Sequence, residues 1–168
     1  MSIRTVFGSL NQYEKGGIQI IRDDPRNYAF SNVFEVATRS RPWEKVAVAR
    51  NMEYVLEAVR AEGTSPWYAA AHDEFALVMD GAVEVRLKKL DDVQRVADGT
   101  AGTTQLAGEP RGKKMGTIRA RRGHQALLPV GAGYQLHAPE PAVLIIQTIR
   151  GALTVERWGE ICISTGGR

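Results

Sequence analysis

Three histidines and one glutamate, Glu74, are considered first as residues that could bind a transition metal or transfer a proton. His72 stands two residues before Glu74, so strand alternation would place both side chains on one face of a sheet. His124 and His137 follow later in the chain. Imidazole and carboxylate groups suit iron and manganese. A site built from His72, Glu74 and His137 is therefore one hypothesis, and surface or supporting positions for the histidines are the alternative.

A strand and a tight turn are predicted to position Glu74. Five apolar residues follow the glutamate, and the run ends in Asp80-Gly81, a strong signal for a two-residue β-hairpin loop. After the turn, residues 83, 85 and 87 are apolar and alternate with charged residues, as in a strand with one wet face. We therefore expect this hairpin to be the element around which a β-barrel is built.

Short strands and a single helix are predicted for the rest of the chain. The strands are expected at residues 18–21, 33–37, 45–49, 115–120, 125–128, 143–149 and 153–157, with turns at 129–133 and 139–141. The helix is expected between Asn51, a suitable N-cap, and Gly63. Its apolar face would consist of Met52, Val55, Leu56 and Val59, packed on the barrel or on a partner. This pattern indicates an all-β jelly-roll barrel with one or two short helices.

Composition narrows the class of protein. A chain of 168 residues with 43% hydrophobic and 24% charged residues is typical of one globular domain. The net charge of +3 is too small to indicate nucleic-acid binding. Cys162 is the single cysteine, so no internal disulfide can form, which favours a cytoplasmic location. The sequence contains no apolar run of membrane-spanning length and no signal-peptide pattern at Met1 to Leu10, so we expect no membrane contact.

Two segments are expected to lie outside the regular barrel. Residues 1–44 are weakly patterned and are predicted to form N-terminal strands or an arm. Residues 91–114 are rich in glycine and threonine and are predicted to form a long flexible loop. The basic residues at its end have no aromatic residues between them, which argues against single-stranded nucleic acid as a ligand.

The spacing of glycines and a proline resembles the two motifs of the cupin family, and this resemblance implies one cupin domain over residues 1–168. Glu74 and Gly81 match the end of the first motif, and Gly123, Pro129 and Gly131 match the start of the second. Metal-binding cupins use three histidines and one glutamate. In this chain the histidine positions hold Tyr68, Ala70 and Tyr134, or Trp67 and Ala69 in place of the first two if the longer spacing is used. Glu74 is the one ligand position with its family residue. The resemblance therefore implies a vestigial site and no metal in this chain.

The stretch from His72 to Gly81, the chain length and the vestigial site together resemble the small subunit of the two-component hydroquinone 1,2-dioxygenases. This resemblance implies a larger cupin partner that holds iron(II), in a heterotetramer of two small and two large chains (α2β2). It also implies ring cleavage of an aromatic diol in the partner, with no catalytic residue in this chain. Because tryptophan is favoured at interfaces, Trp43 and Trp67 are the side chains we consider for a contact with the partner's pocket.

Two other functions remain open. One is a metal-free cupin isomerase or epimerase that uses Tyr134, Glu74 or His72 as acid and base. The other is a cupin that binds a small molecule without catalysis. Turnover by the isolated chain would favour the first, and saturable binding without turnover would favour the second.

Overall fold

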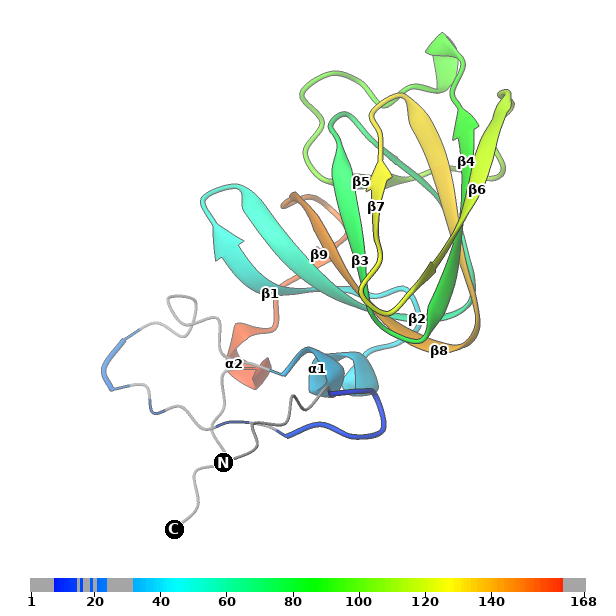
Figure 1. Ribbon diagram of the computed structural model, residues 1–168. Coiled ribbons are helices and arrows are strands. Elements are labelled where there is room, and N and C mark those ends of the chain that lie inside the picture. The colour runs from blue at the N-terminus through cyan, green and yellow to red at the C-terminus, as the bar shows by residue number, and fades with distance from the viewer. Residues whose placement is uncertain (1–7, 15, 17–18, 20, 24–31, 162–168) are drawn as a thin grey trace.

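The computed structural model describes residues 8–14, 16, 19, 21–23 and 32–161 (Figure 1). Residues 18 and 20 of the predicted strand at 18–21, and the cysteine at 162, lie outside these residues. The elements in chain order are α1 (Val33–Arg39), β1 (Lys45–Asn51), β2 (Tyr54–Ala70), β3 (Glu74–Asp80), β4 (Ala82–Lys89), the 3₁₀ turn η2 (Asp92–Gln94), β5 (Thr103–Gln105), β6 (Lys114–Arg121), β7 (Gln125–Leu128), β8 (Ala132–Ile149), β9 (Thr154–Val155) and α2 (Trp158–Ile161). The predicted all-β barrel with one or two short helices is confirmed. No helix of the described part of the chain is long and apolar enough to cross a membrane.

The two longest strands, β2 and β8, are antiparallel partners and belong to both halves of the barrel. At one end of the pair, Val59 lies opposite Leu144, and β1, β9, β3 and β7 extend this half. At the other end, Tyr68 lies opposite Tyr134, and β5, β4 and β6 extend the second half. Figure 1 shows how the two long strands curve through the barrel. The two halves are therefore tied together by continuous backbone.

The strands bend together at one level of the barrel. The pairing of β2 with β8 shifts register between Ala61 and Gly63, opposite residues 138–142 of β8. Pro139 and Pro141 lie in this part of β8, where neither can donate a ladder hydrogen bond. The predicted turn at 139–141 is therefore wrong, because these residues bend a continuous strand.

Asp80-Gly81 also forms a bend and not a hairpin loop. Both β3 and β4 pair with β8, at residues 143–147 and 132–137 respectively, so they follow one another along it. The predicted hairpin is wrong for this reason. Gly81 adopts a φ of 76°, and a Cβ built on it would lie 2.7 Å from the Cβ of Ala142. Glycine is required here by both conformation and packing.

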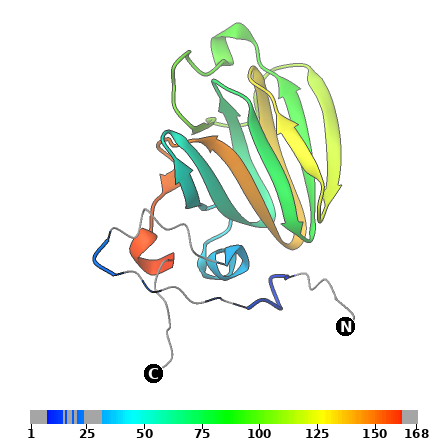
Figure 2. The same cartoon turned by 60° about the vertical axis from the view of Figure 1, so that its left-hand side comes forward.

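Alternating residues of the strands fill the barrel. Its apolar interior includes Val59, Ala76, Val78, Val85, Leu128, Leu136, Leu144 and Ile146. A second cluster joins the outer side of β1 and β2 to both helices, through Val46, Ala58, Val36 and Trp158. The helices accordingly lie side by side at one end of the barrel (Figures 1 and 2).

Two predicted elements have the wrong type. Residues 51–63 do not form a helix, because Asn51 pairs with Tyr54 across a turn that joins β1 to β2. Residues 33–37 do not form a strand; they begin α1, whose N-cap Asn32 accepts a 3.0 Å hydrogen bond from the N–H of Phe34. These β-branched and aromatic residues are helical because α1 packs them against the barrel.

The remaining predictions are nearer to the structure. The predicted strands at 45–49, 115–120, 125–128 and 143–149 correspond to β1, β6, β7 and part of β8, while only Thr154–Val155 of the strand at 153–157 is a strand. The segment 91–114 contains η2 and β5, and Leu106 N–H donates a 2.8 Å hydrogen bond to the carbonyl of Trp67. Flexibility of the segment remains a prediction.

Candidate functional site

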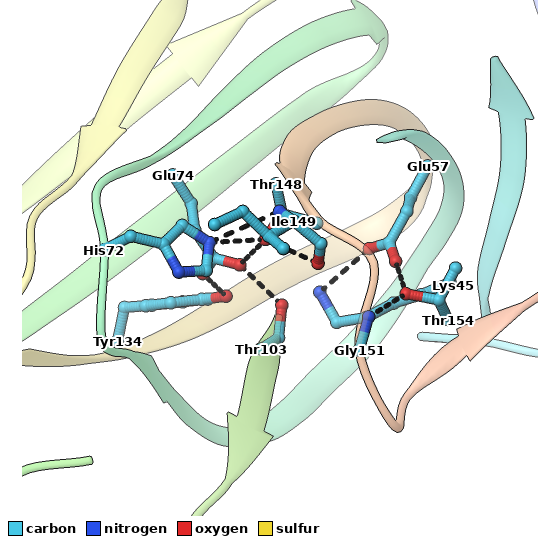
Figure 3. A network of polar contacts seen from close by, with 10 residues as sticks. All are labelled: Lys45, Glu57, His72, Glu74, Thr103, Tyr134, Thr148, Ile149, Gly151 and Thr154. Atoms are coloured by element: carbon cyan, nitrogen blue, oxygen red, sulfur yellow. Dashed lines mark hydrogen bonds and ion pairs between the residues drawn. The ribbon is translucent and has the colours of Figure 1, made fainter. Parts of the chain in front are cut away.

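Glu74 is fully buried at the start of β3 and accepts three short hydrogen bonds (Figure 3). The hydroxyls of Thr103 and Thr148 each donate to Oε1 at 2.6 Å, and the Tyr134 hydroxyl donates to Oε2 at 2.6 Å. These donors come from β5 and β8. A buried carboxylate is costly unless it is hydrogen-bonded, and three hydroxyls meet that need here.

His72 reaches the same carboxylate through Thr148. Its Nε2 lies 2.9 Å from the Thr148 hydroxyl oxygen and 3.4 Å from the N–H of Ile149. The hydroxyl of Thr148 also donates to Glu74, so it links the imidazole ring to the carboxylate. His72 Nδ1 is buried and has no hydrogen-bond partner among the described residues. We call His72, Glu74, Thr103, Tyr134 and Thr148 the Glu74 cluster.

Tyr134, which donates to Glu74, and its neighbour Tyr68 are both neutral phenols. Burial, and secondarily the charge of Glu74, raises the pKa of Tyr134 well above 10.0. Burial raises the pKa of Tyr68 to about 12. The two rings are cross-strand neighbours with centroids 5.8 Å apart. At neutral pH each phenol is therefore a packed ring and a possible hydrogen-bond donor, and neither is a phenolate ligand.

The structure brings together the vestigial cupin positions predicted from the sequence. Tyr68, Glu74 and Tyr134 converge, and Ala70 lies one strand away, opposite Thr103 of β5. This donor set does not fit iron(II): it has no imidazole, and both oxygens of its single carboxylate are already hydrogen-bonded. We therefore assign no chemical step to a metal at this position.

The rearranged site of His72, Glu74 and His137 is wrong. His137 lies in the other half of the barrel, where its Nδ1 is 2.8 Å from the Thr64 hydroxyl. His124 is exposed in the turn after β6 and contacts the backbone of Arg121. Among the residues that the structure describes, no three His, Cys, Asp or Glu side chains form a group that could hold a metal ion.

Sequence analysis missed a second buried polar group next to the first (Figure 3). Glu57 is 1% exposed and accepts a 2.7 Å hydrogen bond from Thr154, and Lys45 Nζ lies 3.9 Å from its other oxygen. Burial raises the pKa of Glu57, although Lys45 lowers it in part. The alternation of Val55, Glu57 and Val59 was a signal for an inward-facing glutamate, and the helical reading hid it.

The two tryptophans considered for partner contact have different surroundings. Trp67 is 7% exposed, and Lys88 Nζ lies 5.8 Å from its ring centroid. Trp43 is partly buried against the barrel and has a φ of 65° in the loop before β1. A contact of either with a partner's pocket remains a prediction.

Two solved structures are similar to this chain over nearly its whole length. No protein-family profile matches the sequence, and no curated protein matches it. One chain of the crystal structure of hydroquinone 1,2-dioxygenase PnpCD with Cd²⁺ and 4-hydroxybenzonitrile is 50% identical, over 97% of this chain and 98% of its own, with a TM-score of 0.88. One chain of hydroquinone 1,2-dioxygenase from Sphingomonas sp. TTNP3 with 4-hydroxybenzoate is 54% identical, over 98% and 100%, with a TM-score of 0.90.

A longer chain of the PnpCD enzyme, from a structure with Fe³⁺, shares the fold. The match covers 89% of this chain and 42% of the longer one, at 13% identity and a TM-score of 0.58. That similarity concerns the fold alone. The two matches at 50% and 54% identity cover nearly the whole chain and therefore show the family as well as the fold. This chain belongs to the hydroquinone 1,2-dioxygenase family, as a subunit of a ring-cleaving dioxygenase.

Proposed function

We propose that this chain is the non-catalytic small subunit of an iron(II)-dependent hydroquinone 1,2-dioxygenase. The observation that carries the proposal is the Glu74 cluster, in which three hydroxyls donate to the one carboxylate at the cupin positions. Tyr68, Ala70 and Tyr134 offer no metal ligand in place of histidines. The chain nevertheless keeps the full length and fold of one chain of the dioxygenase.

The chemistry then belongs to a larger cupin subunit. That subunit would hold the iron and the aromatic diol, and the assembly would contain two small and two large chains. The PnpCD structures support this assignment, because one contains Fe³⁺ and includes a longer chain of the same fold.

An exposed apolar surface supports a permanent partner. Leu56 of β2 and Phe75 of β3 both lie opposite Gln147 of β8, and Leu127 of β7 lies opposite Phe75. The three apolar side chains are 38%, 38% and 43% exposed, on the side of the sheet away from Glu74. We call this set the outer apolar row. Exposed apolar side chains on neighbouring strands of one sheet face are typical of an interface.

The alternative of a metal-free isomerase or epimerase has less support. Glu74 is 0% exposed and Tyr134 is 1% exposed, so a substrate could not reach the pair without opening the Glu74 cluster. An acid–base pair must lie within hydrogen-bond reach of the substrate.

Expression of the small chain, the larger chain and both together tests the proposal. We expect oxygen uptake with hydroquinone only from the mixed complex, with iron that scales with the larger chain. The isolated small chain, loaded anaerobically with iron(II), should retain no iron by elemental analysis. Near-stoichiometric iron in the small chain, lost in His72→Ala, would contradict the proposal.

A further inference from the structure

The ammonium group of the buried Lys45 has few interaction partners among the described residues. Its side chain is 3% exposed, and no hydrogen bond to Nζ is found among the described residues. Its nearest charged group is Glu57 Oε2 at 3.9 Å, which is beyond hydrogen-bond distance. The ring centroid of Tyr68 lies 4.9 Å from Nζ. An ammonium group has three donors, and no described residue accepts a hydrogen bond from any of them.

A pocket of about 470 Å³ opens beside this ammonium group. Its volume is in the range of small-molecule sites. Its lining combines aromatic, apolar and charged residues and includes Arg41, Trp43, Glu44, Lys45, Tyr68 and Gln105. Glu74 and Tyr134 are not part of the lining, so the pocket is separate from the Glu74 carboxylate. We call it the Lys45 pocket.

The charge around the Lys45 pocket favours an anion. Glu44 is the one carboxylate of the lining, and it already accepts a 3.1 Å hydrogen bond from the backbone of Arg41 and pairs with Arg41 and Arg157 at 3.7 and 3.9 Å. Glu57 Oε2 lies 3.9 Å from Lys45 Nζ and accepts no hydrogen bond among the described residues, so the ammonium group keeps donors for a second acceptor. The lining carries two basic side chains, Arg41 and Lys45, against one carboxylate, Glu44, and therefore has a net positive charge.

We propose that the Lys45 pocket binds a small aromatic carboxylate, with the carboxylate on Lys45 Nζ and the ring against Trp43 and Tyr68. The buried ammonium group supplies the charge-assisted hydrogen bond, and the two aromatic side chains supply flat apolar area. Arg41 at the rim attracts the anion. This site lies within one chain and requires neither iron nor the larger subunit.

Titration of the purified, iron-free full chain with benzoate tests this inference, in a buffer without carboxylates. Calorimetry and tryptophan fluorescence should show saturable binding of one benzoate per chain, with a Kd of about 1 mM or below. Benzyl alcohol, the neutral analogue, should bind at least about tenfold more weakly, because it cannot form the charge-assisted bond.

Variants separate the pocket from the rest of the surface. Lys45→Met should weaken benzoate binding by about tenfold or more. Arg41→Glu, at a side chain that is 88% exposed, tests the charge without risk to folding and should weaken binding by several-fold. The matched control is Lys88→Met, since Lys88 also lies over an aromatic ring but pairs with Glu109 at 2.6 Å, outside the pocket; its affinity should equal that of the unchanged chain.

Three results would overturn the inference: no saturation up to about 20 mM benzoate, equal binding of benzyl alcohol, or unchanged affinity in Arg41→Glu together with Lys45→Met. If Lys45→Met does not fold, unchanged affinity in Arg41→Glu alone overturns it. Failure here leaves the dioxygenase-subunit proposal intact, because that proposal is tested by activity and iron content of the mixed complex.

Discussion

At the scale of single residues, one hydroxyl distinguishes two neighbouring tyrosines. Tyr134 donates to Glu74, whereas no hydrogen bond of the Tyr68 hydroxyl is found among the described residues. Tyr134→Phe should lower the free energy of unfolding by about 1–3 kcal/mol, because it leaves Glu74 Oε2 buried without a donor. Tyr68→Phe is the matched control and should change stability far less. Urea unfolding of both variants measures the difference. Equal losses in the free energy of unfolding would mean that the hydrogen bond to Glu74 does not contribute measurably to stability.

Glu57 should make stability depend on pH. Its pKa in the folded chain is raised above 4.5, chiefly by burial, so the folded state binds more protons than the unfolded state. Its contribution to stability is therefore greatest below pH 4.5 and is lost as the pH rises through the folded pKa. Glu57→Gln cannot titrate, so the difference in unfolding free energy between pH 5 and pH 7 should shrink. An unchanged or steeper pH dependence in this variant would contradict the assignment.

Glu74 should matter for packing more than for turnover. Glu74→Gln keeps an acceptor and the shape of the side chain, so we expect the mixed complex to keep its hydroquinone-cleaving activity within about tenfold, equivalent to ~1.4 kcal/mol. Steady-state oxygen uptake, with iron content measured in parallel, checks this. A loss of several orders of magnitude in an assembled, iron-loaded complex would mean that Glu74 takes part in the chemistry.

At the scale of elements, the common level at which the strands bend depends on Gly81. Gly81 and Gly63 both have positive φ, at 76° and 71°. A Cβ at Gly63 would meet nothing within 4 Å, whereas a Cβ at Gly81 would lie 3.0 Å from the Cα of Ala142. Gly63→Ala should cost about 1–2 kcal/mol for the left-handed backbone. Gly81→Ala should cost at least about 1 kcal/mol more. Thermal unfolding measures the stability of both variants. Equal losses of stability would show that β8 moves to make room for the added methyl group.

Features that depend on one strand could be predicted from the sequence, whereas features that depend on which strands pair could not. Period-two alternation located β4, β6 and β7, since it depends on one strand at a time. Residues 55–59 fit a helical face and a strand face equally, and only pairing with β8 decides between them. Asp80-Gly81 gave a turn signal at the right place, but the strand beside β3 is β8, as the pairs Asp80–Val143 and Phe75–Gln147 show, and it lies far along the chain. The resemblance to the cupin motifs pointed to Glu74 and Tyr134, whereas Thr103 and Thr148 are brought to Glu74 by the fold and match no motif.

At the scale of the whole molecule, the outer apolar row should decide assembly. Phe75→Glu places a carboxylate in that row and should prevent a stable complex with the larger subunit, because charges are depleted at the cores of interfaces. Val93→Glu is the control, since Val93 is 91% exposed in η2 and outside the row. Size-exclusion chromatography of co-expressed chains measures complex formation. A complex of normal size and yield with Phe75→Glu would place the interface elsewhere.

The shared hydrogen bonds of the Glu74 cluster also bear on how the chain can evolve. Installing a metal site here would require histidines at several positions that now lie in the packed interior. A histidine in place of Tyr134 removes the phenol that donates to Glu74 before the other ligands exist, so the first step lowers stability. Single substitutions toward a metal site would therefore be opposed by selection for a stable fold, and several changes would have to occur together.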